Sequence, residues 1–239
     1  LDPLNPDRYY GRANFYSNQK GEFKKALLDF SKAIELEPNN LKYLYGRGRL
    51  FSNENEFIDA IKDFKMILDI DSNSIDAINF LGIIYHNQGD FTKSIEEYSK
   101  GISIEKTDPI SASYCYCNRA RVYVELTEYN KALDDFSQAI YLNPTDAELL
   151  YQRGLFYFKS TQEYEKALND FSNAIDLDKS NKDYIYLRGL LLFDYLNQDK
   201  KAIEDFAKAT KEFNPRLDFV KKAKLWTKKT QFQKRKEFM

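Results

Sequence analysis

The chain has 239 residues, of which 43% are hydrophobic and 31% are charged, and its formal net charge is −1. Nine glycines and six prolines are too few for a β-sandwich or a disordered linker, because both need frequent turn residues. No window approaches the roughly eighteen uninterrupted apolar residues of a membrane span. The composition therefore indicates a packed helical protein with enough apolar material for a core.

The first five residues resemble a segment that recurs further along the chain. Leu1-Asp2-Pro3-Leu4-Asn5 is similar to Leu36-Glu37-Pro38-Asn39-Asn40 and to Leu142-Asn143-Pro144, and each of these later segments ends a repeated unit. We therefore expect residues 1–5 to be the tail of a preceding repeat, so that the sequence is a piece of a longer array. If a repeat is missing upstream, the face around Tyr9, Phe15 and Leu27 should be incompletely covered. The alternative is a chance match of a short segment.

Six similar units follow between residues 6 and 215, and self-similarity of this period decides the fold class. Each unit has a small residue, a large apolar residue three places later and a second small residue twelve or thirteen places after the first. An aromatic residue always follows four places further on. The units are 6–40, 41–74, 75–108, 113–146, 147–181 and 182–215. The first small residues are Ala13, Gly48, Gly82, Ala120, Gly154 and Gly189, and the aromatics are Phe30, Phe64, Tyr98, Phe136, Phe171 and Phe206.

These spacings predict two helices in each unit, because apolar residues three and four apart line one helix face. Small residues let the paired helices approach closely, and the aromatic residue fills the remaining gap. Because one helix pair cannot cover its own apolar face, each unit packs on the next. Extra residues fall at Thr107–Ala112 and near Lys20, Thr161 and Asn197. We expect all of these insertions in turns, where they cost little.

The pattern resembles the tetratricopeptide repeat, a unit of about 34 residues. The third unit departs most, with Ser94 and Gly101 in place of the usual alanines and Lys106 in place of the usual proline. The resemblance implies an all-α, right-handed superhelical α-solenoid of about six helix-turn-helix units. It also implies that the first helix of each unit lines an inner, concave face.

The last segment, residues 216–239, contains nine Lys or Arg residues and two acidic residues. Phe219, Ala223 and Trp226 fall at helical spacing within it. We expect a basic, amphipathic C-terminal capping helix that covers the open end of the solenoid. The alternatives are binding to an acidic partner, to nucleic acid or to a membrane surface.

Two opposite charges recur with the repeat. Arginine precedes the small residue in five units, and an acidic residue precedes the aromatic residue in all six. This periodicity predicts a ladder of Arg–carboxylate ion pairs, within a unit or between neighbours. The third unit has Leu81 in place of arginine and Glu97 in place of aspartate. The arginines are Arg12, Arg47, Arg119, Arg153 and Arg188, and the aspartates are Asp29, Asp63, Asp135, Asp170 and Asp205.

The resemblance implies that a partner binds along the concave face, at positions three before and one after the small residue. The expected partner-binding residues are Tyr10, Asn14, Tyr45, Arg49, Asn79, Arg121, Tyr151 and Tyr186. As an alternative, the tyrosines are half-buried spacers between adjacent first helices. The basic and asparagine residues with which some family members clamp acidic chaperone tails are missing in every register. One of those positions, six before the small residue, holds Asp76, Glu148 or Asp183 in three units, and these would repel a carboxylate.

Residues for catalysis or metal binding are scarce. His86 is the only histidine, and Cys115 and Cys117 point to different faces of a helix, so neither a metal site nor a disulfide is expected. No glycine-rich phosphate loop is present, so we expect no cofactor and no enzymatic activity. Free cysteines suit a reducing, intracellular setting, and we expect a cytoplasmic location.

Together these features predict a protein–protein interaction scaffold, or adaptor, that binds a partner peptide or subunit in its concave groove. Two alternatives remain open. The first is a regulatory or substrate-delivering region of an enzyme whose catalytic domain lies outside this sequence. The second, which the repeat region does not favour, is a nucleic-acid adaptor that uses the basic C-terminal helix. The sequence does not identify the partner.

Overall fold

The computed structural model describes residues 4–210, apart from Lys20 and Glu105. These residues form twelve α-helices and one π-helical turn, with no strand among them, so the all-α prediction is confirmed. The chain divides into two compact parts, the first ending at Asn143 and the second beginning at Pro144. The expected capping helix at residues 216–239 lies outside the described residues.

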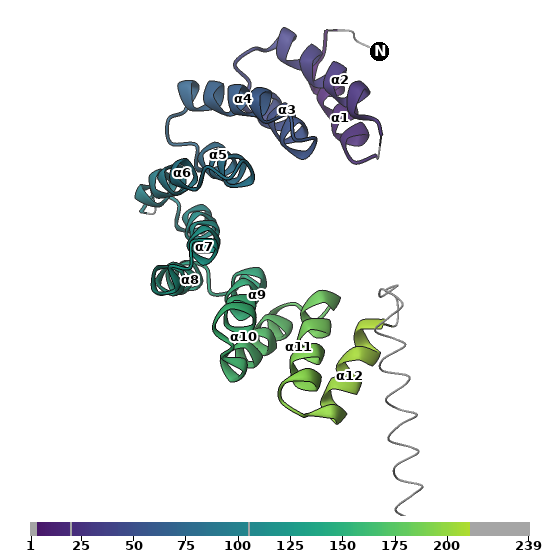
Figure 1. Cartoon of the computed structure of the whole chain (residues 1–239). Helices are drawn as coiled ribbons and strands as arrows, with labels where there is room; N and C mark the ends of the chain where they lie inside the picture. The colour runs from purple at the N-terminus through teal and green to yellow at the C-terminus, as the bar shows by residue number, and fades with distance from the viewer. Residues whose placement is uncertain (1–3, 20, 105, 211–239) are drawn as a thin grey trace, which may run out of the picture. The chain divides into compact units, whose positions relative to one another are not determined.

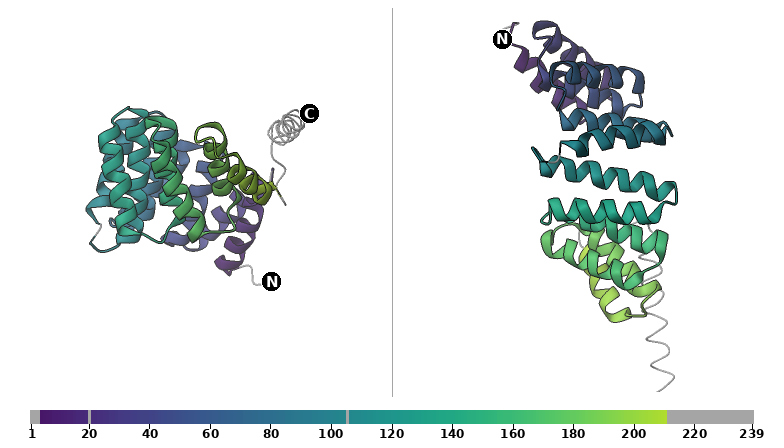
Figure 2. Two further views of the ribbon diagram at one scale, coloured as in Figure 1. Left: turned by 90° about the horizontal axis from the view of Figure 1, so that it is seen from below. Right: turned by 90° about the vertical axis from the view of Figure 1, so that its left-hand side faces the viewer.

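The first part contains eight helices arranged as four hairpins (Figure 1). Its first helices, α1, α3, α5 and α7, lie on one side of the row, and its second helices, α2, α4, α6 and α8, lie on the other. Successive hairpins stack as layers (Figure 2). The helices are α1 (Pro6–Ser17), α2 (Phe23–Leu36), α3 (Leu41–Asn53), α4 (Phe57–Ile70), α5 (Ile75–Asn87), α6 (Phe91–Ser103), α7 (Pro109–Glu125) and α8 (Tyr129–Leu142).

The second part contains two further hairpins of the same kind, and α10 of the first packs against α11 of the second. Its helices are α9 (Ala147–Phe156), the π-helical turn Tyr157–Thr161, α10 (Tyr164–Leu177), α11 (Lys182–Asp194) and α12 (Asp199–Thr210). No helix in the described part of the chain is long and apolar enough to cross a membrane.

Side-chain caps start several first helices. The Asn40 side chain accepts a hydrogen bond from the Lys42 amide at 3.1 Å, and Asn181 accepts one from the Asp183 amide at 3.0 Å. Such caps satisfy backbone N–H groups that the helix itself leaves without a partner. Asn5 caps α1 in the same way, with a distance of 3.0 Å to the Asp7 amide. The first helix therefore begins like the first helices that follow a complete unit.

The small residues allow the aromatic ring of the second helix to lie on the backbone of the first. A Cβ atom added at Gly82 would stand 2.4 Å from the Tyr98 ring, and one at Gly154 would stand 2.7 Å from the Phe171 ring. The aromatic residues Phe30, Phe64, Phe136 and Phe171 are at most 2% exposed. Close approach of the paired helices is thus confirmed, and it leaves no room for a side chain at these glycines.

Two predicted insertions do not lie in turns. Thr107–Ala112 largely extends α7, which starts at Pro109 and runs for 17 residues, so the fourth unit begins before the predicted residue 113. Asp108 accepts a hydrogen bond from the Ser111 amide at 3.0 Å, and proline is favourable in the first helical turn. The extra residue near Thr161 widens the end of the first helix into the π-helical turn. Asn197 does lie in a turn, with φ of 50°, and Lys20 is outside the described residues.

Candidate functional site

The predicted charge ladder is present, and each arginine pairs within its own unit. Arg47 donates from Nε and Nη2 to the two carboxylate oxygens of Asp63, at 2.8 and 2.7 Å. The same paired geometry joins Arg12 to Asp29, Arg119 to Asp135, Arg153 to Asp170 and Arg188 to Asp205. All five aspartates are buried. The arginines therefore hold the two helices of a unit together, and this stripe is not a surface for an acidic ligand.

Three ladder arginines also reach the preceding unit. The Nη1 atoms of Arg47, Arg119 and Arg188 donate to the hydroxyls of Ser31, Ser99 and Ser172, at 3.4, 2.8 and 3.3 Å. In the third unit, where leucine replaces arginine, Glu97 pairs with Lys100 on the same helix at 2.7 Å. The longer acidic side chain thus finds a cation nearer the surface.

Three of the four predicted tyrosines, Tyr10, Tyr45 and Tyr151, pack against the next first helix, whereas Tyr186 packs on Phe206 of its own unit. The Tyr45 ring lies edge-on to Phe64 at 6.0 Å and to Phe80 at 5.3 Å, and burial raises its pKa. In the second part, Tyr151 lies 4.7 Å from the Tyr184 ring, and burial raises the Tyr151 pKa to about 12. All four predicted tyrosines, Tyr10, Tyr45, Tyr151 and Tyr186, are half-buried. The rings of Tyr10, Tyr45 and Tyr151 therefore act as spacers, as in the alternative interpretation, and only the remaining part of each ring is open to a partner.

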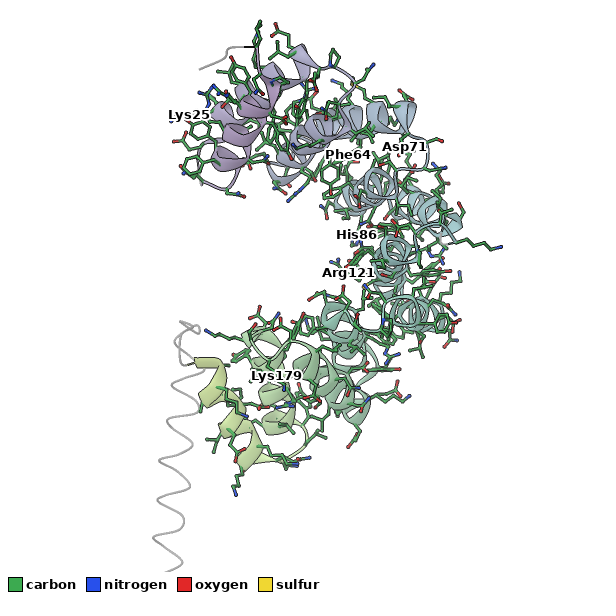
Figure 3. The ribbon with its side chains drawn as sticks, turned by 180° about the vertical axis from the view of Figure 1, so that it is seen from behind. Lys25, Phe64, Asp71, His86, Arg121 and Lys179 are labelled. Atoms are coloured by element: carbon green, nitrogen blue, oxygen red, sulfur yellow. The ribbon has the colours of Figure 1, made fainter. Side chains whose placement is uncertain are left out.

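A polar cluster, defined here as Asn79, Asn118 and Arg121, joins α5 to α7 on the side of the first helices. The Asn118 Nδ2 donates to the Asn79 Oδ1 at 2.9 Å, and the Arg121 Nη1 donates to the Asn118 Oδ1 at 3.3 Å. Arg121 is exposed on this inner side (Figure 3). Its guanidinium keeps donors available, because within the cluster only Nη1 donates a hydrogen bond.

Asn118 was not predicted as a partner-binding residue. Its position, two before the small residue, carries asparagine in only one of the six units, so the sequence shows no ladder of asparagines there. The structure gives it a role because it links the two predicted residues of the cluster. The signal that could have found it is Asn79 on the neighbouring first helix, which stands one place earlier in its own unit, three before the small residue.

The remaining inner residues of the first part differ in how open they are. Arg49 is exposed and lies 5.8 Å from the centre of the Tyr45 ring. Asn14 donates to the Tyr10 carbonyl at 3.0 Å, so its amide is engaged within α1. The exposed carboxylate of Asp76 adds to the rise in the Tyr45 pKa, so its negative charge acts on this wall. The side of α3, α5 and α7 that carries these residues is here called the inner wall. It offers two cations (Arg49, Arg121), two amides (Asn79, Asn118), one carboxylate (Asp76) and the edges of aromatic rings.

The structure brings Asn79 and Arg121 together through Asn118, and Tyr45 together with Arg49. Among the described residues, no hydrogen bond connects these two groups to each other. Six of the eight predicted residues lie in the first part, and Tyr151 and Tyr186 lie in the second.

The other reactive side chains are buried or paired. Cys115 and Cys117 are both buried, and burial raises the Cys115 pKa to about 12, so its thiol stays protonated at neutral pH. The His86 Nε2 lies 2.8 Å from the Glu125 Oε1. Within the described residues, no three His, Cys, Asp or Glu side chains stand together in a way that could hold a metal ion.

Comparison with known sequences identifies the repeat. A sequence model described as "Tetratricopeptide repeat" matches residues 6–40, 75–108 and 147–181, and one described as "TPR repeat" matches residues 120–160. No curated protein matches the chain.

Several solved structures are similar in fold at low sequence identity. The structure of pilF from Pseudomonas aeruginosa covers 90% of this chain and 95% of its own, with 18% identity and a TM-score of 0.66. A tetratricopeptide repeat protein from Parabacteroides merdae covers 94% and 85%, with 19% identity and a TM-score of 0.67. PilW, described as a widely conserved type IV pilus biogenesis factor, covers 90% and 97%, with 15% identity and a TM-score of 0.69. Identities this low establish the shared fold and nothing about a shared partner.

Proposed function

Because the chain belongs to the tetratricopeptide-repeat family, we propose that it is a protein-binding scaffold whose first part holds a partner segment along α3, α5 and α7. Proteins of this family generally mediate protein–protein interaction. The observation that carries the proposal is the polar cluster of Asn79, Asn118 and Arg121. It is the one place on the inner wall where side chains of two successive units are hydrogen-bonded to each other and an exposed guanidinium is held beside them, among the described residues.

The chemistry of the wall suggests what the partner segment carries. Amide side chains can both donate to and accept from a peptide backbone, and Arg121 and Arg49 can each pair with a carboxylate. The exposed edge of Tyr45 adds apolar contact. Asp76 disfavours a run of acidic residues next to it. These groups together suit an extended or helical segment of mixed charge better than a purely acidic tail.

Replacement of Arg121 by alanine tests this proposal. Peptides would be selected on the intact chain from a displayed library of random sequences, and the tightest binder would be measured against variants by calorimetry. Arg121→Ala should weaken binding by about 2 kcal/mol, or roughly thirtyfold, because truncation of a central polar anchor leaves its partner unpaired. Asn118→Ala should have a similar effect, since the arginine then loses its positioning contact.

Lys65→Ala is the matched control. Lys65 is an exposed cation of the same part, but it stands on the second helix α4. Its loss removes the same charge from the protein and should leave the affinity within about twofold. Equal loss of affinity in the Lys65 and Arg121 variants would mean that overall charge governs binding, and the inner-face proposal would then be abandoned.

A further inference from the structure

Phe15 on α1 is far more exposed than the residues that correspond to it. Its side chain is 61% exposed, although it stands two places after the small residue, a position that is otherwise buried. The counterparts Leu50, Ile84, Val122 and Leu191 are 4%, 0%, 0% and 0% exposed. The same position is therefore a core position in the later units and a surface position in the first.

The second helix of the preceding unit covers these counterparts. Leu50 belongs to the cluster that contains Ala26 and Phe30 of the first unit. Ile84 lies in a cluster with Ala60 and Phe64, and Val122 lies in one with Tyr98. What is missing next to Phe15, among the described residues, is thus a helix of one known kind.

The ladder arginine shows the same difference. The Arg12 side chain is 55% exposed, against 21%, 18% and 22% for Arg47, Arg119 and Arg188. Each of these three donates from Nη1 to a serine of the preceding unit. Arg12 binds Asp29 through Nε and Nη2, and no described residue offers its Nη1 such a hydroxyl. An occupant of this surface would complete the bond with a serine.

Arg8 adds a charge to this surface. It is exposed, whereas its counterparts Tyr43 and Tyr184 are 2% and 4% exposed. Those tyrosines donate to carboxylates on the preceding first helix, Tyr43 to Asp7 at 3.1 Å and Tyr184 to Glu148 at 2.9 Å. In these two units the position thus faces a carboxylate of the preceding first helix. An arginine there suits the same acidic neighbour.

From these contacts we propose that Arg8, Arg12 and Phe15, here called the N-terminal face, form an unfilled interface between units. We commit to one occupant, a tetratricopeptide hairpin joined to the chain through residues 1–5. The cap formed by Asn5 supports this connection, because it repeats the caps of Asn40 and Asn181, each of which is the last residue of a complete unit. Each cap residue also stands four places after a leucine, namely Leu1, Leu36 and Leu177.

The face differs in part from the surface expected from the sequence, which consisted of Tyr9, Phe15 and Leu27. Phe15 is open as expected, but Tyr9 is half-buried. Leu27 packs in the cluster that contains Leu50, so it belongs to the opposite side of the unit, which faces the second unit.

The fifth unit of this chain is a suitable probe. Residues 147–181, placed before Pro6 in exchange for residues 1–5, would bring Ser172 for Arg12, Glu148 for Arg8 and the same Leu-to-Asn spacing. We expect hydrogen exchange of the α1 amides to slow by at least tenfold, because terminal helices open locally and a packed neighbour closes them. The same graft on a chain with Phe15→Asp and Arg12→Ala is the matched control and should not slow exchange.

Two results would overturn the proposal. One is equal exchange in α1 with and without the graft, or equal slowing in the control, which would show that the face does not receive a hairpin. The other concerns the ungrafted chain in sedimentation. A dimer that Phe15→Asp converts to a monomer would show that a second copy of the chain fills the face instead. A monomer with either residue at position 15 is the expected result.

Discussion

Replacement of Arg119 by leucine should lower the free energy of unfolding by about 3 kcal/mol, because it leaves the buried carboxylate of Asp135 without its cation. Asp135 is 6% exposed, and burial already raises its pKa although Arg119 opposes the shift. Urea unfolding followed by far-ultraviolet circular dichroism would measure the loss. Arg121→Leu is the matched control on the same helix, because it removes an exposed cation, and it should change stability by at most about 0.5 kcal/mol.

The deficit of the Arg119 variant should depend on pH. A carboxyl group whose pKa is raised by folding contributes its stability fully below its unfolded pKa, about 3.9, and loses it as pH rises through the folded pKa. Without Arg119 the Asp135 pKa rises further, so the deficit should be largest near pH 7 and shrink toward pH 4. A deficit that is constant over this range would mean that lost packing, not the stranded charge, explains the effect.

The third unit suggests how to repair the variant. It has Leu81, Glu97 and Lys100 at the three positions concerned, and its Glu97 pairs with Lys100. The triple variant Arg119→Leu, Asp135→Glu, Gln138→Lys carries the same set in the fourth unit. It should recover more than half of the lost stability, since the longer carboxylate can reach the new surface cation. Failure to recover would show that the third unit tolerates leucine for another reason.

Phe64→Ala should lower the free energy of unfolding by about 4 kcal/mol, the second large effect, because it opens a cavity where three aromatic rings of the second and third units meet. Phe64 is fully buried and is stacked on Phe80 at 5.1 Å, with the Tyr45 ring at 6.0 Å. Tyr45 and Phe80 both pack on Phe64, so their side chains should become more mobile in the variant. Chemical unfolding measures the loss.

Phe15→Ala provides the comparison for a phenylalanine of the same fold at an exposed site. Because Phe15 is 61% exposed, its truncation should change stability by less than about 0.5 kcal/mol. A cost similar to that of Phe64→Ala would contradict the account of which ring positions carry the core.

The fold could be predicted because each signature residue makes the same packing contact within every unit. For example, the Tyr98 ring on the second helix lies against the backbone of the first helix at Gly82, so both residues of this contact belong to one unit. The Arg–Asp pairing followed from the same periodicity. The periodicity did not show whether each arginine pairs with the aspartate of its own unit, 16 or 17 residues away, or with that of a neighbouring unit. Both arrangements repeat with the same period. The predicted start of the fourth unit at residue 113 is wrong, because the local start signal Asp108-Pro109 outweighs the standard length of a unit.

The candidate site was less predictable, because it depends on single residues that do not recur. Tyr45 and Tyr151 stand at inner positions, but their rings also pack on the next unit, and this depends on the bulky residues Phe80 and Tyr184. Asn118 was overlooked because its importance comes from Asn79, which lies 39 residues away in sequence. Contacts of this kind depend on the stacking of successive units rather than on the pattern within a unit.

The central claim is that a partner segment lies on the first helices of the first part. Hydrogen exchange with and without the selected peptide tests this most directly, since it reports protection element by element. The account predicts slower exchange in α3, α5 and α7, greatest around Asn118 and Arg121, with α4 and α6 unchanged. Protection confined to α4 and α6, or absent from α7, would contradict it.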